Sequence, residues 1–196
     1  MILFRNDKNV FGVKYWLQIY TFFWLYDVLC IDLHCKILYT QNMNFTIRSA
    51  GEADFPAILS IIKALALFER APEKVTNTVE QMKAEKDYFN CLVAVNEDDE
   101  VIAICLYFFA YYTWVGKSLY LDDLYVLEQY RRHGIAAALL NELFEIARRE
   151  QCNRVRWQVL DWNETAINFY QKINATLDYE WVNCDFDKKG IMEFKI

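Results

Sequence analysis

The run Val101–Tyr111 most constrains the fold of this chain, because nearly all of its residues are apolar. A strand that is apolar on both faces has to be covered on both faces. The flanking runs Cys91–Val95 and Ser118–Leu127 are also typical of strands, and the turns Asn96–Glu100 and Thr113–Lys117 separate the three. We therefore expect a sheet whose central strands lie between two layers of helices.

The rest of the chain predicts an alternation of strands and helices, with Asp54, Thr78 and Asn163 as helix N-caps. The order is β-α-α-β-β-β-α-β-α-β-β, which indicates one α/β domain over residues 44–196, built on a mixed sheet. Further strands are expected at 45–48 and 154–160, helices at 54–68, 78–88, 134–149 and 163–173, and two short strands within 177–196 around 185–190.

Residues 1–43 differ from this domain and form an N-terminal extension whose role stays open. Val10–Leu33 is long enough to span a bilayer, but Lys14 and Asp27 interrupt it. Four interpretations remain: an additional packed or amphipathic segment, a membrane anchor or interfacial helix, a signal peptide, or a stretch that is not natively part of the domain. Association with a membrane is not expected unless this segment is an anchor.

The charge and the composition exclude several classes of function. Lys and Arg number 21 against 27 Asp and Glu, a net charge of −6, which argues against nucleic-acid binding and suits a small cationic partner. The six cysteines form no CxxC pair, and there are only two histidines, so we expect no metal site. The cysteine usage fits a reducing, cytoplasmic compartment.

The segment Tyr130–Ala137 carries the strongest local signal for binding. It follows a predicted strand and opens the longest predicted helix. Free backbone N–H groups and the helix dipole make such a junction an anion site, Gly134 allows close approach, and Arg131 and Arg132 add positive charge. The segment lacks the GKS or GKT of a P-loop and the repeated glycines of a dinucleotide fingerprint.

Arg131-x-x-Gly134-x-Ala136 resembles the Q/R-x-x-G-x-G/A acetyl-CoA motif of the GNAT acetyltransferase superfamily. The similarity is greatest to diamine (spermidine/spermine) acetyltransferases and thialysine acetyltransferases, and it covers about residues 44–182. The segments that carry it are Ile62–Glu69, Tyr107–Lys117, Leu119–Val126 and Val159–Tyr170.

The resemblance implies a GNAT fold in which acetyl-CoA binds between two splayed parallel strands, here Ser118–Leu127 and Arg154–Leu160. It also implies a homodimer. The expected acetyl-CoA contacts are Leu124, Tyr125, Val126, Arg131, Arg132, His133, Gly134, Ile135, Ala136, Ala137, Asn163, Glu164, Thr165, Ala166 and Tyr170.

Amine attack on a thioester needs a proton acceptor for the amine and a proton for the departing thiolate. Tyr170 matches the family tyrosine that supplies the second proton. Asp122 and Asp123 lie in an apolar strand, where carboxylates are costly without a role. Neighbouring strand residues face opposite ways, so we expect one of them in the cleft, and the resemblance points to Asp122. The expected substrate contacts are Phe68, Glu69, Asp122, Arg156, Trp157 and Gln158.

Five positions depart from the relatives: Asp122 replaces Glu, Phe68 replaces Tyr, Tyr112 replaces an Asp of the polyamine enzymes, and Arg132 and Ala136 each replace Gly. The lost acid favours a shorter amine or a thialysine-like amino acid over spermidine. We therefore expect direct acetyl transfer from acetyl-CoA to a small cationic amine. The alternatives are a protein or peptide N-acetyltransferase, and a non-catalytic, membrane-tethered acyl-CoA-binding module.

Overall fold

The computed structural model describes residues 43–196. The chain divides into two compact units, one ending at Arg156 and the other comprising Trp157–Ile196. The interpretations of the N-terminal extension concern residues outside the described ones, apart from Met43. Among residues 43–196, no helix has the length and apolar character needed to cross a membrane.

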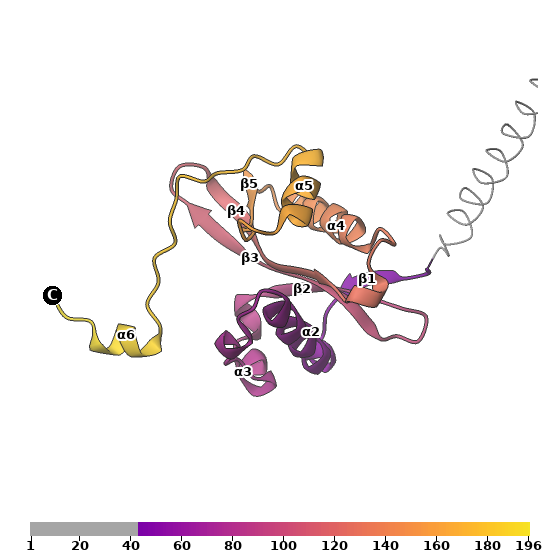
Figure 1. Cartoon of the computed structure of the whole chain (residues 1–196), viewed down its shortest axis with the longest axis horizontal. Coiled ribbons are helices and arrows are strands. Elements are labelled where there is room, and N and C mark those ends of the chain that lie inside the picture. Colours follow the sequence, from indigo (N-terminus) through magenta and orange to yellow (C-terminus); the bar gives the residue numbers. More distant parts are fainter. Residues whose placement is uncertain (1–42) are drawn as a thin grey trace, which may run out of the picture. The chain divides into compact units, whose positions relative to one another are not determined.

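The first unit contains one five-stranded sheet in the order β1-β2-β3-β4-β5 (Figure 1). Its neighbouring strands are antiparallel except for β4 and β5, which run parallel. The expected mixed sheet is thus confirmed. The strands are β1 (Thr46–Ser49), β2 (Asn90–Val95), β3 (Val101–Tyr112), β4 (Gly116–Val126) and β5 (Arg154–Arg156).

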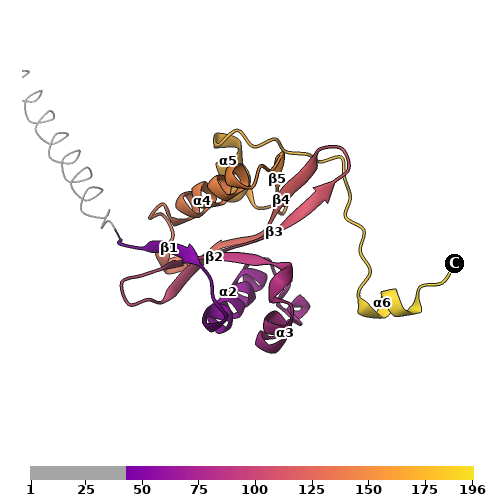
Figure 2. The ribbon, with the colours of Figure 1, turned by 180° about the vertical axis from the view of Figure 1, so that it is seen from behind.

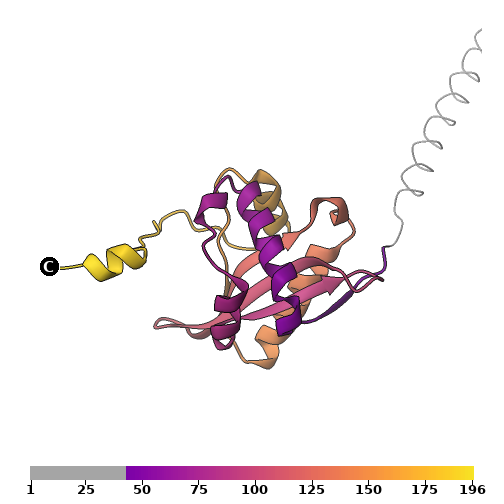
Figure 3. The same cartoon turned by 90° about the horizontal axis from the view of Figure 1, so that it is seen from below.

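Helices cover both faces of this sheet, as the apolar central strand requires. α2 (Phe55–Phe68) and α3 (Val79–Ala84) lie on one side and α4 (Ile135–Arg149) on the other (Figures 1 and 2). Figure 3 views the sheet from the side of α2, which runs across the strands. Thr78 begins α3 as predicted, because its Oγ1 accepts a hydrogen bond from Gln81 N at 3.1 Å. The 3₁₀ turns are η1 (Glu52–Asp54), η2 (Pro72–Lys74), η3 (Lys86–Tyr88) and η4 (Glu128–Tyr130).

A β-bulge interrupts the pairing of β3 with β4 at the two predicted acids. Leu106 pairs with Asp123 and Tyr107 pairs with Leu121, so Asp122 is an extra residue on β4. Leu106 belongs to the core beneath α2, and paired residues share a face, which places Asp123 on the α2 face. The sequence predicted side chains that alternate between the two faces of this strand. The alternation fails at Asp122, because the bulge adds one residue there, next to Asp123.

The parallel pair is shorter than predicted, since β5 ends at Arg156 instead of Leu160. The ladder joins Ser118 to Arg154 and Tyr120 to Arg156, while β4 continues to Val126. One residue, Leu121, separates the last β4 residue that pairs with β5, Tyr120, from the bulge at Asp122. A bulge increases local twist. The bulge therefore turns β4 away from the direction that β5 would have to follow, near the point at which the pairing of β4 with β5 ends.

The second unit contains α5 (Glu164–Lys172) and α6 (Lys188–Glu193). Asn163 is the N-cap of α5 as predicted, and its Oδ1 accepts a hydrogen bond from Ala166 N at 3.2 Å. The two strands predicted within 177–196 are wrong, because the structure has no strand there. The missed signal is local: Asp187 begins a helix by accepting a hydrogen bond from Gly190 N at 2.7 Å.

Candidate active site

The carboxylates of Asp122 and Glu69 both act electrostatically on Asp123, on the α2 side of the sheet in the first unit. Glu69 is the C-cap residue of α2, and Asp122 and Asp123 form the bulge of β4. Burial raises the pKa of Glu69 and of Asp122, although Asp122 remains exposed at the surface. Within residues 43–196 none of the three forms an ion pair with a basic side chain. The cluster is thus arranged to attract an external cation.

Asp123 is the most perturbed member of this cluster. Burial raises its pKa from 3.8 to about 7, and the carboxylates of Asp122 and Glu69 contribute to that rise. The structure therefore brings together the predicted Asp122 and Glu69 and adds Asp123, which the sequence analysis set aside. The signal that could have identified Asp123 was the pair of adjacent acids, which an alternating strand cannot hold on one face but a bulge can.

Arg131 connects the end of β4 with the end of α2. Its Nε donates a hydrogen bond to Val126 O at 3.1 Å, and its guanidinium carbon lies 5.1 Å from the ring centre of Tyr125 and 5.5 Å from that of Phe68. The two rings are themselves 6.4 Å apart. The cation–π contacts of Arg131 thus connect the loop before α4 with Phe68, the residue next to Glu69.

The loop before α4 has the backbone that an anion site needs. Gly134 is the N-cap in a left-handed conformation with φ +80°, and nothing lies within 4 Å of where its Cβ would be. The first helical hydrogen bond joins Ala138 N to Gly134 O at 3.0 Å, and no side chain caps the earlier N–H groups. Among the neighbouring residues, Arg132 and Ala137 are exposed, and His133 and Ala136 are half-buried. The side chain of Ile135 is buried, so this residue can contact a ligand only through its backbone.

The edge of β4 beyond Tyr120 offers a second set of backbone groups. Leu124, Tyr125 and Val126 pair with β3 on one side. On the other side, β5 pairs with β4 only as far as Tyr120, so no strand of the described chain covers this stretch. An extended ligand with amide groups, such as a pantetheine arm, fits an open strand edge of this kind.

The second unit holds the remaining predicted residues. Tyr170 on α5 is buried, with its ring centre 5.1 Å from that of Trp157 and 5.6 Å from that of Phe169. Gln158 Nε2 donates a hydrogen bond to Asn183 Oδ1 at 2.7 Å. Glu164 and Thr165 are exposed in the first turn of α5, where Asn163 serves as the cap.

Residues 56–175 match the family described as "Acetyltransferase (GNAT) family". The chain belongs to this family. Mouse thialysine N-epsilon-acetyltransferase is 34% identical over 161 residues, which cover 75% of this chain and 95% of the relative. The Caenorhabditis elegans enzyme of the same name is 34% identical, covering 77% and 97%. The human spermidine/spermine N(1)-acetyltransferase-like protein 1 is 35% identical, but the match covers only 20% of its length.

Solved structures support the GNAT fold. An integron cassette protein from Vibrio cholerae has a TM-score of 0.62 at 22% identity, covering 77% of this chain and 97% of that one. A possible acetyltransferase from Clostridium difficile gives 0.62 at 24% identity, covering 73% and 98%. The expected fold and enzyme family are thereby confirmed. In the described part of the chain, no group of three or more His, Cys, Asp or Glu side chains is placed to hold a metal ion.

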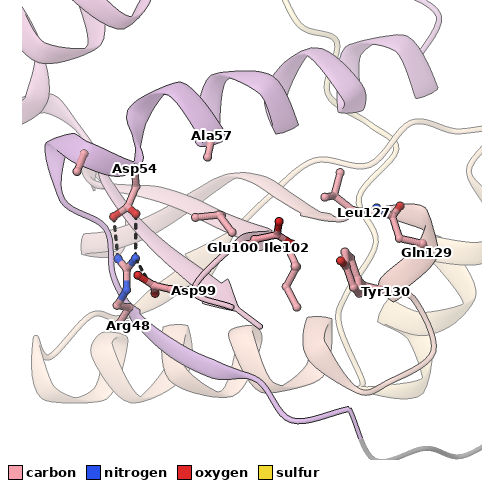
Figure 4. A pocket seen from close by; sticks show the side chains of 11 residues that line it. Arg48, Asp54, Ala57, Asp99, Glu100, Ile102, Leu127, Gln129 and Tyr130 are labelled. Carbon is pink, nitrogen blue, oxygen red and sulfur yellow. Dashed lines mark hydrogen bonds and ion pairs between the residues drawn. The ribbon is translucent and has the colours of Figure 1, made fainter. Parts of the chain in front are cut away.

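A cavity of about 620 Å³ lies away from these residues, at the N-terminal end of α2 (Figure 4). Arg48 lines this cavity, and its Nη1 donates a hydrogen bond to Asp54 Oδ2 at 2.7 Å. Asp99 Oδ1 lies 3.7 Å from Arg48 Nη2. Leu127 and Tyr130 form the opposite wall. None of the predicted site residues lines this cavity, and α2 is about 20 Å long, so Glu69 is at the far end of the helix.

Proposed function

We propose that this GNAT acetyltransferase transfers an acetyl group from acetyl-CoA to a primary amine of a small cationic acceptor. The observation that carries the proposal is the convergence of Glu69, Asp122 and Asp123 without a basic partner among the described residues. The sequence similarity to thialysine N-epsilon-acetyltransferases also supports the proposal, because the name of these relatives states an amine acceptor.

The carboxylates hold the acceptor and then take up its proton. An alkylammonium ion has to lose a proton before its nitrogen can attack. A carboxylate with an ordinary pKa near 4 is a weak acceptor for that proton, whereas Asp123, with a pKa of about 7, is a better one. Asp122 is exposed and directly adjacent, so it can contact the ammonium group and pass the proton on through water.

The loop before α4 and the open edge of β4 would bind the acetyl donor. Acetyl-CoA, when bound, supplies an acyl thioester. The free N–H groups after Gly134 and the charge of Arg132 suit its pyrophosphate. The edge at Leu124–Val126 suits the pantetheine arm, and an N–H group there can polarise the thioester carbonyl.

Tyr170 would complete the reaction as the general acid. As the amine nitrogen bonds to the acyl carbon, the carbon–sulfur bond breaks and the sulfur needs a proton. A phenol has an ordinary pKa near 10, close to that of an alkyl thiol, so the transfer from Tyr170 is well matched. This role rests on the match of Asn163–Tyr170 to the family and on the retention of a tyrosine at that position.

The experiment that tests the proposal is an acetyl-transfer assay on the full chain, which follows release of free thiol from acetyl-CoA. The acceptor panel contains spermidine, spermine, putrescine, thialysine and lysine, and a series of peptides with free amino groups serves as comparison. We expect turnover with at least one small amine. Turnover with peptides alone would contradict the proposal, and so would the absence of transfer to every acceptor.

A further inference from the structure

One side chain, Arg131, contacts both halves of the candidate active site. Its Nε donates a hydrogen bond to Val126 O at 3.1 Å, and Val126 belongs to the strand edge proposed for the pantetheine arm. Its guanidinium carbon lies 5.5 Å from the ring centre of Phe68, which directly precedes the acceptor-site residue Glu69. Because no carboxylate within residues 43–196 forms an ion pair with Arg131, these contacts position its guanidinium in the described chain.

The end of α2 meets β4 at two neighbouring positions. Asp123 and Tyr125 pair with residues of the core beneath α2, so both lie on the α2 face of the sheet. The Glu69 carboxylate contributes to the raised pKa of Asp123, and the ring centre of Phe68 lies 6.4 Å from that of Tyr125. Asp123 and Tyr125 are two residues apart, a step of about 7 Å along the strand. Since Phe68 and Glu69 are adjacent, a shift of the Phe68 ring also moves the Glu69 carboxylate relative to Asp123.

The helix end that carries Phe68 and Glu69 lies at the surface. The Phe68 side chain is 39% exposed, and the guanidinium of Arg131 and the ring of Tyr125 lie against it. Glu69 is also exposed and follows the last residue of α2, so no further helical turn holds it. Ordering an exposed helix end costs conformational entropy, which contacts of this kind have to offset. Arg131 therefore fixes the acceptor-side residues to the degree that its own backbone is fixed.

The backbone of Arg131 belongs to the loop proposed to bind the acetyl donor. Its N–H donates a hydrogen bond to Glu128 O at 3.2 Å. Gly134, three residues further on, is the left-handed N-cap that precedes the free N–H groups of α4. A ligand that occupies both these N–H groups and the strand edge at Val126 restricts the short loop at both of its ends. The sequence analysis expected Arg131 at the pyrophosphate because of its charge, and its side-chain contacts give it a second role.

We propose that Arg131 is a positioning residue that couples the donor site to the acceptor site. Acetyl-CoA at the loop before α4 holds Arg131 in place, and Arg131 in turn holds Phe68 and Glu69 in the arrangement that binds the amine. The inference rests on the proposed function and adds to it that each substrate binds more tightly when the other is present. The first ligand offsets the entropy lost on ordering the loop and the helix end, so the second ligand meets a site that is already ordered.

Equilibrium binding to the full chain tests the coupling. Coenzyme A is the donor probe, because it has no acetyl group to transfer, and thialysine and spermidine are the amine probes. We expect saturating coenzyme A to lower the Kd of the bound amine at least about fivefold, and the amine to lower the Kd of coenzyme A by the same factor. An amine Kd that coenzyme A leaves unchanged would overturn the inference and leave the proposed function intact. If neither amine binds with or without coenzyme A, the proposed function is contradicted, and the inference with it.

Arg131→Lys separates this role from a purely electrostatic one. Lysine keeps the positive charge but lacks the planar group that donates through Nε and stacks on two rings. We expect the coupling to be lost, so that the Kd of the amine becomes the same with and without coenzyme A. Arg132→Gln is the matched control, because it removes the exposed cation of the next residue. It should weaken the binding of coenzyme A and retain the coupling. Retained coupling in Arg131→Lys, or an equal loss in Arg132→Gln, would overturn the inference.

Phe68 allows the same measurement away from the donor loop. Phe68→Leu keeps an apolar side chain but removes the ring that contacts Arg131. It should lose the coupling while the Kd of coenzyme A alone stays unchanged. Phe68→Tyr keeps the ring and should retain the coupling. Any loss of amine affinity that is the same with and without coenzyme A leaves the ratio of the two Kd values unaffected, so a purely structural effect does not imitate the result. Equal coupling in Phe68→Leu and Phe68→Tyr would overturn the inference.

Discussion

Asp123 has a pKa of about 7 because it is buried and because the carboxylate of Asp122 lies beside it on the bulge of β4. Two adjacent acids on a strand would ordinarily face apart. The extra residue at Asp122 lets both contribute to one side of the sheet. The acidic cluster thus depends on an irregularity of the backbone as much as on the side chains.

The raised pKa of Asp123 predicts how stability depends on pH. The folded state keeps the Asp123 proton up to about pH 7, whereas the unfolded chain loses it near pH 4. The folded state therefore binds more protons between these values, and the free energy of unfolding falls as the pH rises through this window. Asp123→Asn should remove this fall and stabilise the protein above about pH 7 by a few kcal/mol.

Urea denaturation of both proteins at about pH 5 and about pH 8 measures this difference. The variant should gain stability relative to the wild type at the higher pH. Glu150→Gln is a suitable control, because Lys117 lowers the pKa of Glu150 and its effect has the opposite sign. Parallel stability curves for wild type and Asp123→Asn would show that Asp123 titrates normally.

Asp122→Asn tests the acceptor site separately from the donor site. Removing the exposed carboxylate should raise KM for the amine or lower kcat/KM at least about tenfold, because the ammonium loses a charged partner. The affinity for acetyl-CoA should change little, since the loop before α4 is untouched. Kinetics with each substrate varied in turn make the comparison. Equal losses for both substrates would argue against the assignment.

Tyr170→Phe tests the general acid. The variant keeps the ring that contacts Trp157 and Phe169 and removes only the hydroxyl. We expect kcat to fall at least about tenfold, with acetyl-CoA affinity nearly intact. Phe169→Leu, which perturbs the same packing and leaves the hydroxyl, separates a structural effect from loss of the proton. If Tyr170→Phe turns over at the wild-type rate, Tyr170 is not the acid.

Much of this fold could be predicted from the sequence because its elements are locally encoded. The apolar run of β3 and the caps Thr78 and Asn163 each specify their elements directly. The bulge at Asp122 was not predictable in this way, since it depends on the register between two strands. Arg156 was an expected substrate contact, but the packing of Arg154 and Arg156 on the Tyr112 ring, at 5.4 Å and 5.9 Å, was not expected, because these residues meet only through the pairing of β5 with β4.

Arg132 adopts a left-handed conformation with φ +69°, which favours glycine. Arg132→Gly should therefore raise the free energy of unfolding by up to about 1 kcal/mol. Glycine relieves the backbone strain of the folded state, and the larger conformational entropy of the unfolded chain offsets part of that gain. If the exposed guanidinium binds the pyrophosphate, KM for acetyl-CoA should rise several-fold in the same variant. Thermal denaturation and steady-state kinetics measure the two effects.

Gln151→Gly is the matched control, since Gln151 also has a positive φ, +55°, but follows α4 at its other end. It should give a similar gain in stability with no change in KM for acetyl-CoA, because it lies far from the free N–H groups after Gly134. Arg132→Lys keeps the charge and the strained backbone, so it should resemble the wild type in both measurements. An Arg132→Gly variant with wild-type KM would remove Arg132 from the donor site and leave Gly134 and its neighbouring N–H groups as the anion-binding element.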